Sequence, residues 1–83
     1  MEQIVRTAKQ VGTAIRRVRR AKSLTQSGVG SKTRMRQGTI SRLETGEADT
    51  QLRTLFDVLS ALDLEIVIRP RSKASIKEIE DLF

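Results

Sequence analysis

Arg36 and Gln37 are adjacent in the sequence and offer side chains that can read the edges of DNA bases. A guanidinium can donate two hydrogen bonds to O6 and N7 of guanine, or bind a phosphate, and a glutamine amide can pair with N6 and N7 of adenine. Small polar and basic residues follow closely, among them Thr39, Ser41 and Arg42, whose side chains suit contacts with phosphate oxygens. This stretch therefore has the chemistry of a surface that contacts a nucleic acid.

The distribution of charge favours an anionic partner. The chain has 83 residues, with 16 Lys and Arg against 10 Asp and Glu, and a net charge of +6. Eleven of the basic residues lie between Gln3 and Leu43, where no acidic residue occurs, whereas residues 44–68 hold six acidic residues and one basic residue. Such polarity is typical of a nucleic-acid-binding protein. With two Phe and no Tyr or Trp to stack on bases, double-stranded DNA is expected rather than a single strand.

The missing residue types exclude several classes of site. The chain has no Cys and no His, which excludes a thiol nucleophile, a disulfide framework and an ordinary zinc site. We expect no metal, no cofactor and no enzymatic activity, because the acidic residues do not cluster as a pair of catalytic carboxylates would. No apolar run is long enough to span a membrane, so we expect a cytoplasmic protein without a membrane partner.

Helices must position these side chains, and the spacing of apolar residues predicts where they lie. A first helix is expected from about Ile4 to Lys22, with a basic outer face. Thr25 is the expected N-cap of a second helix that covers Gln26 to Lys32, which only Val29 can anchor. A third helix of about two turns follows Met35 and carries the candidate base-reading residues.

The clearest amphipathic pattern predicts a fourth helix from Gln51 to Leu62. Gly46 suits the left-handed end of the third helix, and either Asp49 or Thr50 can cap the fourth. Its apolar residues recur every three or four positions and are all expected in the core: Leu52, Leu55, Phe56, Leu59 and Leu62.

The residues after this helix change to the two-residue period of a strand. Leu64 to Arg69 alternates and is β-branched, and Pro70 ends the pattern. Because no partner strand occurs elsewhere in the chain, we expect pairing with the same strand of a second copy, through Leu64, Ile66, Val67 and Ile68. Residues 1–69 would then form the DNA-binding and dimerisation domain, and residues 70–83 a tail that is a short helix or disordered.

Three segments resemble the Xre (Cro/CI-type) helix-turn-helix family. They are Leu24-Thr25-Gln26, Ile40-Ser41-Arg42-Leu43-Glu44-Thr45-Gly46, and Leu52 to Leu62. The strand and Met35-Arg36-Gln37-Gly38-Thr39-Ile40-Ser41 are similar, more narrowly, to HipB-like antitoxins. The resemblance implies a mostly α phage-repressor-like domain of 4–5 helices, plus one C-terminal β-strand that pairs across a homodimer. The family usually has Gly where Arg34 stands, which predicts a shifted or opened turn there, because a left-handed Arg is strained.

The resemblance also implies roles for individual residues. Arg36 and Gln37 would read bases, and Arg19 would form an internal ion pair with Glu44. Gln26 would bind a phosphate at the start of the second helix, as in the family. From their chemistry and charge, we expect further contacts with the DNA backbone from Thr39, Ser41, Arg42, Lys32 and Arg16.

The implied function is that of a DNA-binding antitoxin in a type II toxin-antitoxin system. Such a protein represses its own operon as a dimer on a palindromic operator, associates with the bacterial nucleoid and binds a HipA-like serine/threonine kinase toxin. A phage- or host-type repressor without a toxin partner is the main alternative. A module that binds an acidic protein is a third, and an enzyme is least expected.

Overall fold

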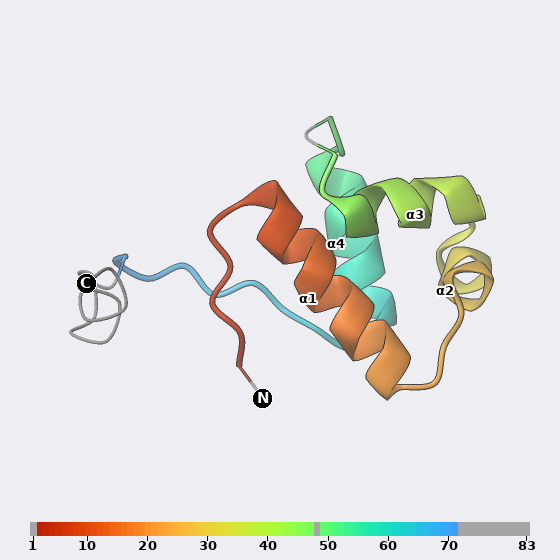
Figure 1. Ribbon diagram of the computed structural model, residues 1–83, viewed down its shortest axis with the longest axis horizontal. Coiled ribbons are helices and arrows are strands. Elements are labelled where there is room, and N and C mark those ends of the chain that lie inside the picture. The colour runs from red at the N-terminus through yellow and green to blue at the C-terminus, as the bar shows by residue number, and fades with distance from the viewer. Residues whose placement is uncertain (1, 48, 72–83) are drawn as a thin grey trace.

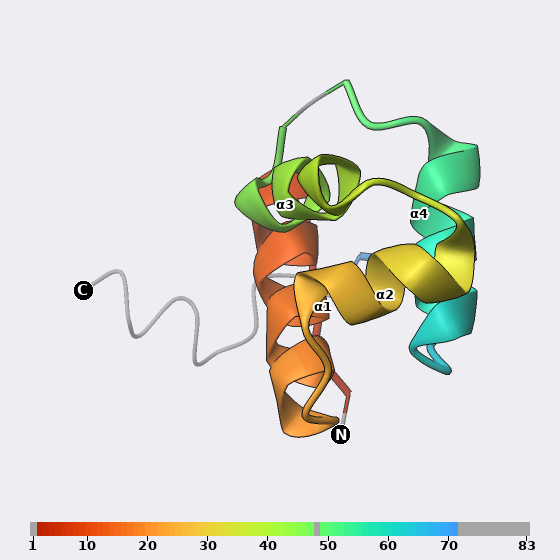
Figure 2. The ribbon, with the colours of Figure 1, turned by 90° about the vertical axis from the view of Figure 1, so that its right-hand side faces the viewer.

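The computed structural model describes residues 2–47 and 49–71, and this part of the chain contains four α-helices (Figure 1). They are α1 (Ala8–Ala21), α2 (Gln26–Thr33), α3 (Gln37–Thr45) and α4 (Leu52–Ala61). Helix α3 packs against α1 and α2, and α2 also packs against α4. In Figure 2, α2 lies nearest the viewer and runs from the side of α1 toward α4, with α3 above it. None of the four has the length and apolar character that crossing a lipid bilayer requires.

Every helix contributes to one core. Its fully buried side chains come from α1, α2, α3 and from α4 with its C-cap; they are Ile15, Val29, Ile40, Val58 and Leu62. Leu43 and Leu59 are also buried, and Leu55 and Leu64 pack partly against this cluster. The core therefore holds α2 and α3 in a fixed relation to each other.

Helix α1 begins four residues later than expected. Thr7 is extended and its hydroxyl accepts a hydrogen bond from the Gln10 amide at 3.0 Å, so the helix begins at Ala8 rather than near Ile4. The Gln10 side-chain oxygen accepts in turn from the Arg6 amide at 2.6 Å. This exchange resembles a capping box and keeps the preceding residues out of the helix.

The turn between α2 and α3 is closed, and the expectation of a shifted or opened turn at Arg34 is wrong. Thr25 caps α2 as predicted, with its hydroxyl 2.9 Å from the Gly28 amide. At the other end Arg34 adopts the left-handed conformation, with φ 58° and ψ 38°. The Met35 amide then donates to the Gly30 carbonyl at 2.8 Å, which ends the helix. An Ala at position 30 would place its Cβ only 2.6 Å from the Met35 carbonyl oxygen, so Gly30 makes this tight turn possible.

Helix α4 departs from two predictions. Its N-cap is Gln51, which makes no side-chain capping bond, rather than Asp49 or Thr50; the Thr50 hydroxyl donates instead to the Glu47 carbonyl at 3.3 Å. Leu52 and Phe56, expected in the core, are 69% and 52% exposed. The apolar stripe of α4 is wider than the surface that α2 covers, so these two side chains lie at its uncovered edge.

Residues at both ends of the described chain lie outside the helices. The segment expected as a strand, Leu64 to Ile68, leaves α4 as an extended chain, and no strand occurs within residues 2–47 and 49–71 (Figure 1). Residues 2–7 line a common groove with Glu65 and residues 67–71. Most of the tail, residues 72–83, lies outside the described residues.

Candidate nucleic-acid interface

Arg36 and Gln37 open α3, and both side chains are exposed. Arg36 is the N-cap residue, with extended backbone angles and no side-chain capping bond. Its carbonyl accepts hydrogen bonds from the amides of Thr39 and Ile40, at 3.0 and 3.4 Å. The backbone thus starts the helix without using either side chain, and both remain directed to the surface of the motif.

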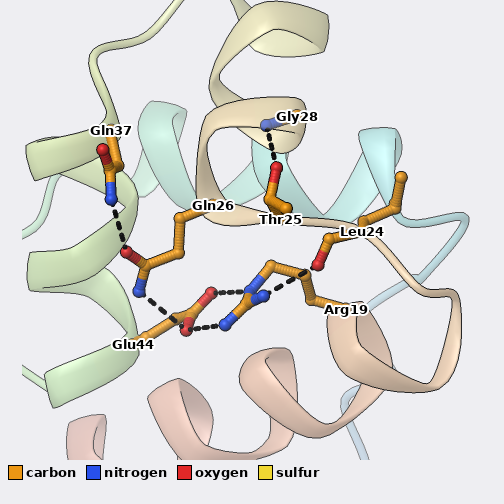
Figure 3. Close-up of polar contacts among 7 residues, drawn as sticks. All are labelled: Arg19, Leu24, Thr25, Gln26, Gly28, Gln37 and Glu44. Atoms are coloured by element: carbon orange, nitrogen blue, oxygen red, sulfur yellow. Dashed lines mark hydrogen bonds and ion pairs between the residues drawn. The ribbon is translucent and has the colours of Figure 1, made fainter.

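Two residues at the start of α2 hold the Gln37 side chain, and Figure 3 shows the contact with one of them, Gln26. Its Nε2 donates to Oε1 of Gln26 at 3.3 Å, and its Oε1 accepts from the Ser27 hydroxyl at 3.4 Å. Sequence reasoning did not select Ser27. Its position next to Gln26, in the first turn after the Thr25 cap, is the signal that could have placed it near the N-terminus of α3.

A buried ion pair joins α1 to α3 beneath these residues. Arg19 Nε lies 2.6 Å from Glu44 Oε2, and Nη2 lies 3.0 Å from Oε1, which is the pair expected from the sequence. The two residues are only 8% and 6% exposed. Arg19 Nη1 also donates to the Leu24 carbonyl at 2.8 Å, and Gln26 Nε2 donates to Glu44 Oε1 at 3.2 Å (Figure 3). The pair therefore has hydrogen-bond partners for its charge, as burial requires.

The environment of Glu44 stabilises its charged form. Burial raises the pKa of the carboxyl, but hydrogen bonds from Arg19 and Gln26 and the charges of Arg19 and Arg16 outweigh burial, so the pKa of Glu44 is lowered. The hydrogen bond to Glu44 correspondingly raises the pKa of Arg19, against the effect of burial. Both groups are thus charged at neutral pH, and the link between α1 and α3 is ionic.

The other residues selected from the sequence are spread around the motif. Thr39 and Ser41 are half-buried on α3, whereas Lys32 at the end of α2 and Arg16 on α1 are exposed. Arg42 is exposed, and its Nε lies 3.7 Å from Glu47 Oε2. An exposed pair of this length contributes little and leaves the guanidinium available. The structure brings Gln26 and Gln37 into contact, and it leaves the basic side chains on the surrounding surface.

Residues 2–47 and 49–71 contain no group of three or more His, Cys, Asp or Glu side chains that could hold a metal ion. The described groups with shifted pKa values are Arg19 and Glu44, which bind each other. The N-terminus of α3 therefore presents two exposed side chains that can form hydrogen bonds, Arg36 and Gln37, and basic residues surround them.

Comparison with known proteins identifies relatives over most of the chain. The helix-turn-helix family model (HTH_3) matches residues 15–68. Antitoxin HipB of Escherichia coli K12 is 32% identical over 71 residues, which cover 86% of this chain and 81% of HipB. An uncharacterized helix-turn-helix-type transcriptional regulator of Sinorhizobium fredii is 37% identical over 57 residues, but the match spans only 29% of that longer protein.

Structures of HipB are among the solved structures similar to this chain. A HipB-O4 20mer complex has a TM-score of 0.80 and 30% identity, covering 86% of this chain and all of that one. A HipA-HipB-O2-O3 complex gives the same values. Together with the residues matched by the family model, these relatives show that the chain belongs to the Xre-type helix-turn-helix family and is a homologue of the antitoxin HipB.

Proposed function

We propose that the chain binds a palindromic operator as a homodimer, represses its own operon and acts as the antitoxin of a HipA-like serine/threonine kinase toxin. The main support for sequence-specific DNA binding is the exposed pair Arg36 and Gln37 at the start of α3. Gln37 is held in place by Gln26 and Ser27 of α2. Helix α3 would enter the major groove with its N-terminal residues against the bases. Gln37 would pair with adenine, and Arg36 with guanine or a phosphate.

Contacts with the DNA backbone would supply most of the affinity. We assign them to the polar and basic residues around α3, namely Gln26, Thr39, Ser41, Arg42, Lys32 and Arg16. Each phosphate neutralised by a cation steepens the dependence of log K on log salt by about 0.9. Removing Lys32 or Arg16 should therefore weaken binding to all sequences alike and reduce this slope by nearly one.

Dimerisation would place two copies of α3 on successive turns of DNA, about 34 Å or a multiple of it apart. The support for a dimer is the extended segment Leu64 to Ile68, which carries exposed apolar side chains and has no strand partner among the described residues. A two-stranded pairing with a second copy would satisfy its backbone.

The proposed toxin partner follows from the relatives. One of the solved structures is a complex that contains both HipA and HipB. The present chain aligns with the whole of the matched chain at 30% identity. The match to HipB also covers most of both proteins, whereas the match to the Sinorhizobium regulator covers 29% of it. The greater coverage of HipB favours an antitoxin over a repressor without a toxin.

DNA reading can be tested by gel shift on the upstream region of the operon with Gln37→Ala and Arg36→Ala. Gln51→Ala and Arg53→Ala, at exposed positions at the start of α4, are matched controls for the change in amide and in charge. We expect Gln37→Ala to lose discrimination at one position of each half-site, while both controls bind as the wild type does. Unchanged sequence preference in both variants at α3 contradicts the base-reading assignment.

Toxin binding can be tested separately by co-expression with the product of the neighbouring gene. The full chain should co-purify with a kinase, and a chain that ends at residue 70 should retain DNA binding but bind the kinase less well. If the neighbouring product is no kinase, or does not associate, the repressor without a toxin becomes the better assignment.

A further inference from the structure

The segment after α4 carries a charge pattern that complements itself. From Leu64 to Pro70 the chain is extended, and residues 65–71 form no backbone-to-backbone hydrogen bond with another described residue. Ile66, Val67 and Ile68 are 45%, 71% and 95% exposed. Glu65 and Arg69 flank these three apolar residues, one on each side and at equal distance from Val67 in the sequence.

Symmetry restricts how two copies of such a segment can pair. Two identical antiparallel strands in one sheet are related by a two-fold axis perpendicular to the sheet, so a residue and its symmetry mate point to the same face. Directly opposed residues must also share a face, because side chains alternate along a strand. Both conditions hold only when the two-fold axis passes through a residue that faces its own symmetry mate. Moving the axis to the next residue changes the partner of every residue by two positions.

We propose that two copies of the chain pair antiparallel with Val67 on the two-fold axis, which deepens the homodimer proposed above and rests on it. In this register Glu65 lies opposite the partner's Arg69, and Ile66 lies opposite the partner's Ile68. Val67 then meets the partner's Val67. Every charged side chain faces its opposite and every apolar side chain faces another, which is the arrangement that stabilises cross-strand pairs.

The two neighbouring registers give less favourable cross-strand pairs. With Ile66 at the centre, Glu65 opposes the partner's Val67, and Arg69 could meet only Asp63, whose left-handed backbone (φ 60°) lies in the turn after α4 rather than in an extended strand. With Ile68 at the centre, Ile66 opposes Pro70, which has no amide to donate, and Val67 opposes a charged Arg69.

The Val67 register also assigns the two faces of the ribbon. Leu64, Ile66 and Ile68 share one face, and Leu64 already packs partly against the core while its amide donates to the Leu59 carbonyl at 2.8 Å. This face would extend the core into the dimer. Glu65, Val67 and Arg69 share the other face, where two equivalent ion pairs would flank the central valines.

Cysteine cross-linking tests the register directly, because the natural chain has no cysteine. Opposed residues of an antiparallel pair have Cα atoms about 4.5–5.5 Å apart, which suits a disulfide. We expect Val67→Cys to form a covalent dimer under mild oxidation at least about tenfold faster than Ile66→Cys or Ile68→Cys alone. An equimolar mixture of the last two should form the mixed disulfide readily. Fastest self-linking at position 66 or 68, or no linking in a protein that sediments as a dimer, overturns the register.

A charge exchange gives an independent test in solution. In a homodimer of either Glu65→Arg or Arg69→Glu, positions 65 and 69 carry the same charge and face each other twice. The dimer dissociation constant of each variant should therefore rise about tenfold. Mixing the two variants should yield mainly the heterodimer, in which all four charges are complementary again. Arg71→Glu is the control, because it makes the same change in charge as Arg69→Glu but lies outside the paired residues. Its dimer dissociation constant should stay near the wild-type value.

A heterodimer no more stable than either homodimer contradicts the proposed opposition of residues 65 and 69. A wild-type chain that is monomeric at all concentrations would instead remove the proposed homodimer itself. Sedimentation of the wild type therefore separates failure of the register from failure of the function on which it rests.

Discussion

Replacing Gly12 with Ala should destabilise the protein, although alanine is the better helix former. Gly12 is buried where α1 crosses the end of α3, and an added Cβ would lie 2.5 Å from the carbonyl oxygens of Leu43 and Glu44. Real Cβ contacts essentially never fall below 3.0 Å, and ordinary ones start at 3.4 Å, so the two backbones would have to separate by about 0.5–0.9 Å. Because both neighbours are backbone atoms, we expect a cost near the upper end of the range for overpacking, about 3 kcal/mol. Helix propensity offsets about 1 kcal/mol, which leaves a net loss of about 2 kcal/mol.

Gly38→Ala is the matched control. Gly38 is exposed on α3, and a Cβ there meets nothing within 4 Å, so the same substitution should raise the free energy of unfolding by about 1 kcal/mol. Urea denaturation followed by far-UV circular dichroism, at one protein concentration, measures both changes with association held constant. The reasoning is refuted if Gly12→Ala unfolds at the same urea concentration as Gly38→Ala, or at a higher one.

Three further substitutions test other parts of the structure. Because the pKa of Glu44 is lowered on folding, its contribution is complete above the usual value of 4.5 and is lost as the pH falls through the lower folded pKa. Glu44→Gln should therefore be less stable at neutral pH and lose less stability between pH 5 and 2 in urea titrations; an unchanged acid slope argues against this origin. Arg34→Gly should raise the free energy of unfolding by about 1 kcal/mol, and the urea midpoint with it, because it removes a left-handed arginine. Arg17→Gly inside α1 should lower the free energy of unfolding by a similar amount. Leu62→Ala, at a fully buried position, should cost about 2–5 kcal/mol, and a loss below 1 kcal/mol in the same assay would mean that the core closes around the missing atoms.

Local chemistry made the helix-turn-helix unit predictable. The Thr25 hydroxyl caps α2 and Gly46 ends α3 in a left-handed conformation, because a cap depends on residues only two or three positions away. Val29, the single large apolar residue of α2, is 1% exposed, as an isolated anchor must be. The ion pair of Arg19 and Glu44 is a long-range contact, and only resemblance to a family indicated it.

The errors have both distant and local causes. Leu52 and Phe56 fit the apolar period of α4, but the period does not reveal how much of the stripe a neighbouring helix covers. At Arg34 the closing hydrogen bonds to Gly30 and the packing of α3 hold a conformation that the residue alone disfavours. The start of α1 was a local error, since the Thr7 and Gln10 spacing is visible in the sequence and overrides the apolar position of Ile4.

The buried carboxylate of Glu44 sets the order of donor and acceptor at the surface of the motif. A carboxylate can only accept, so Gln26 must turn its NH₂ group toward Glu44 and its oxygen toward Gln37. Gln37 must then direct one N–H back to Gln26 and its oxygen to the Ser27 hydroxyl. These contacts leave one N–H and one oxygen lone pair of the exposed Gln37 amide for a base, and pairing with N7 and N6 of adenine requires one donor and one acceptor of this kind. A charge in the core thus determines the polarity of the side chain that we propose reads the base.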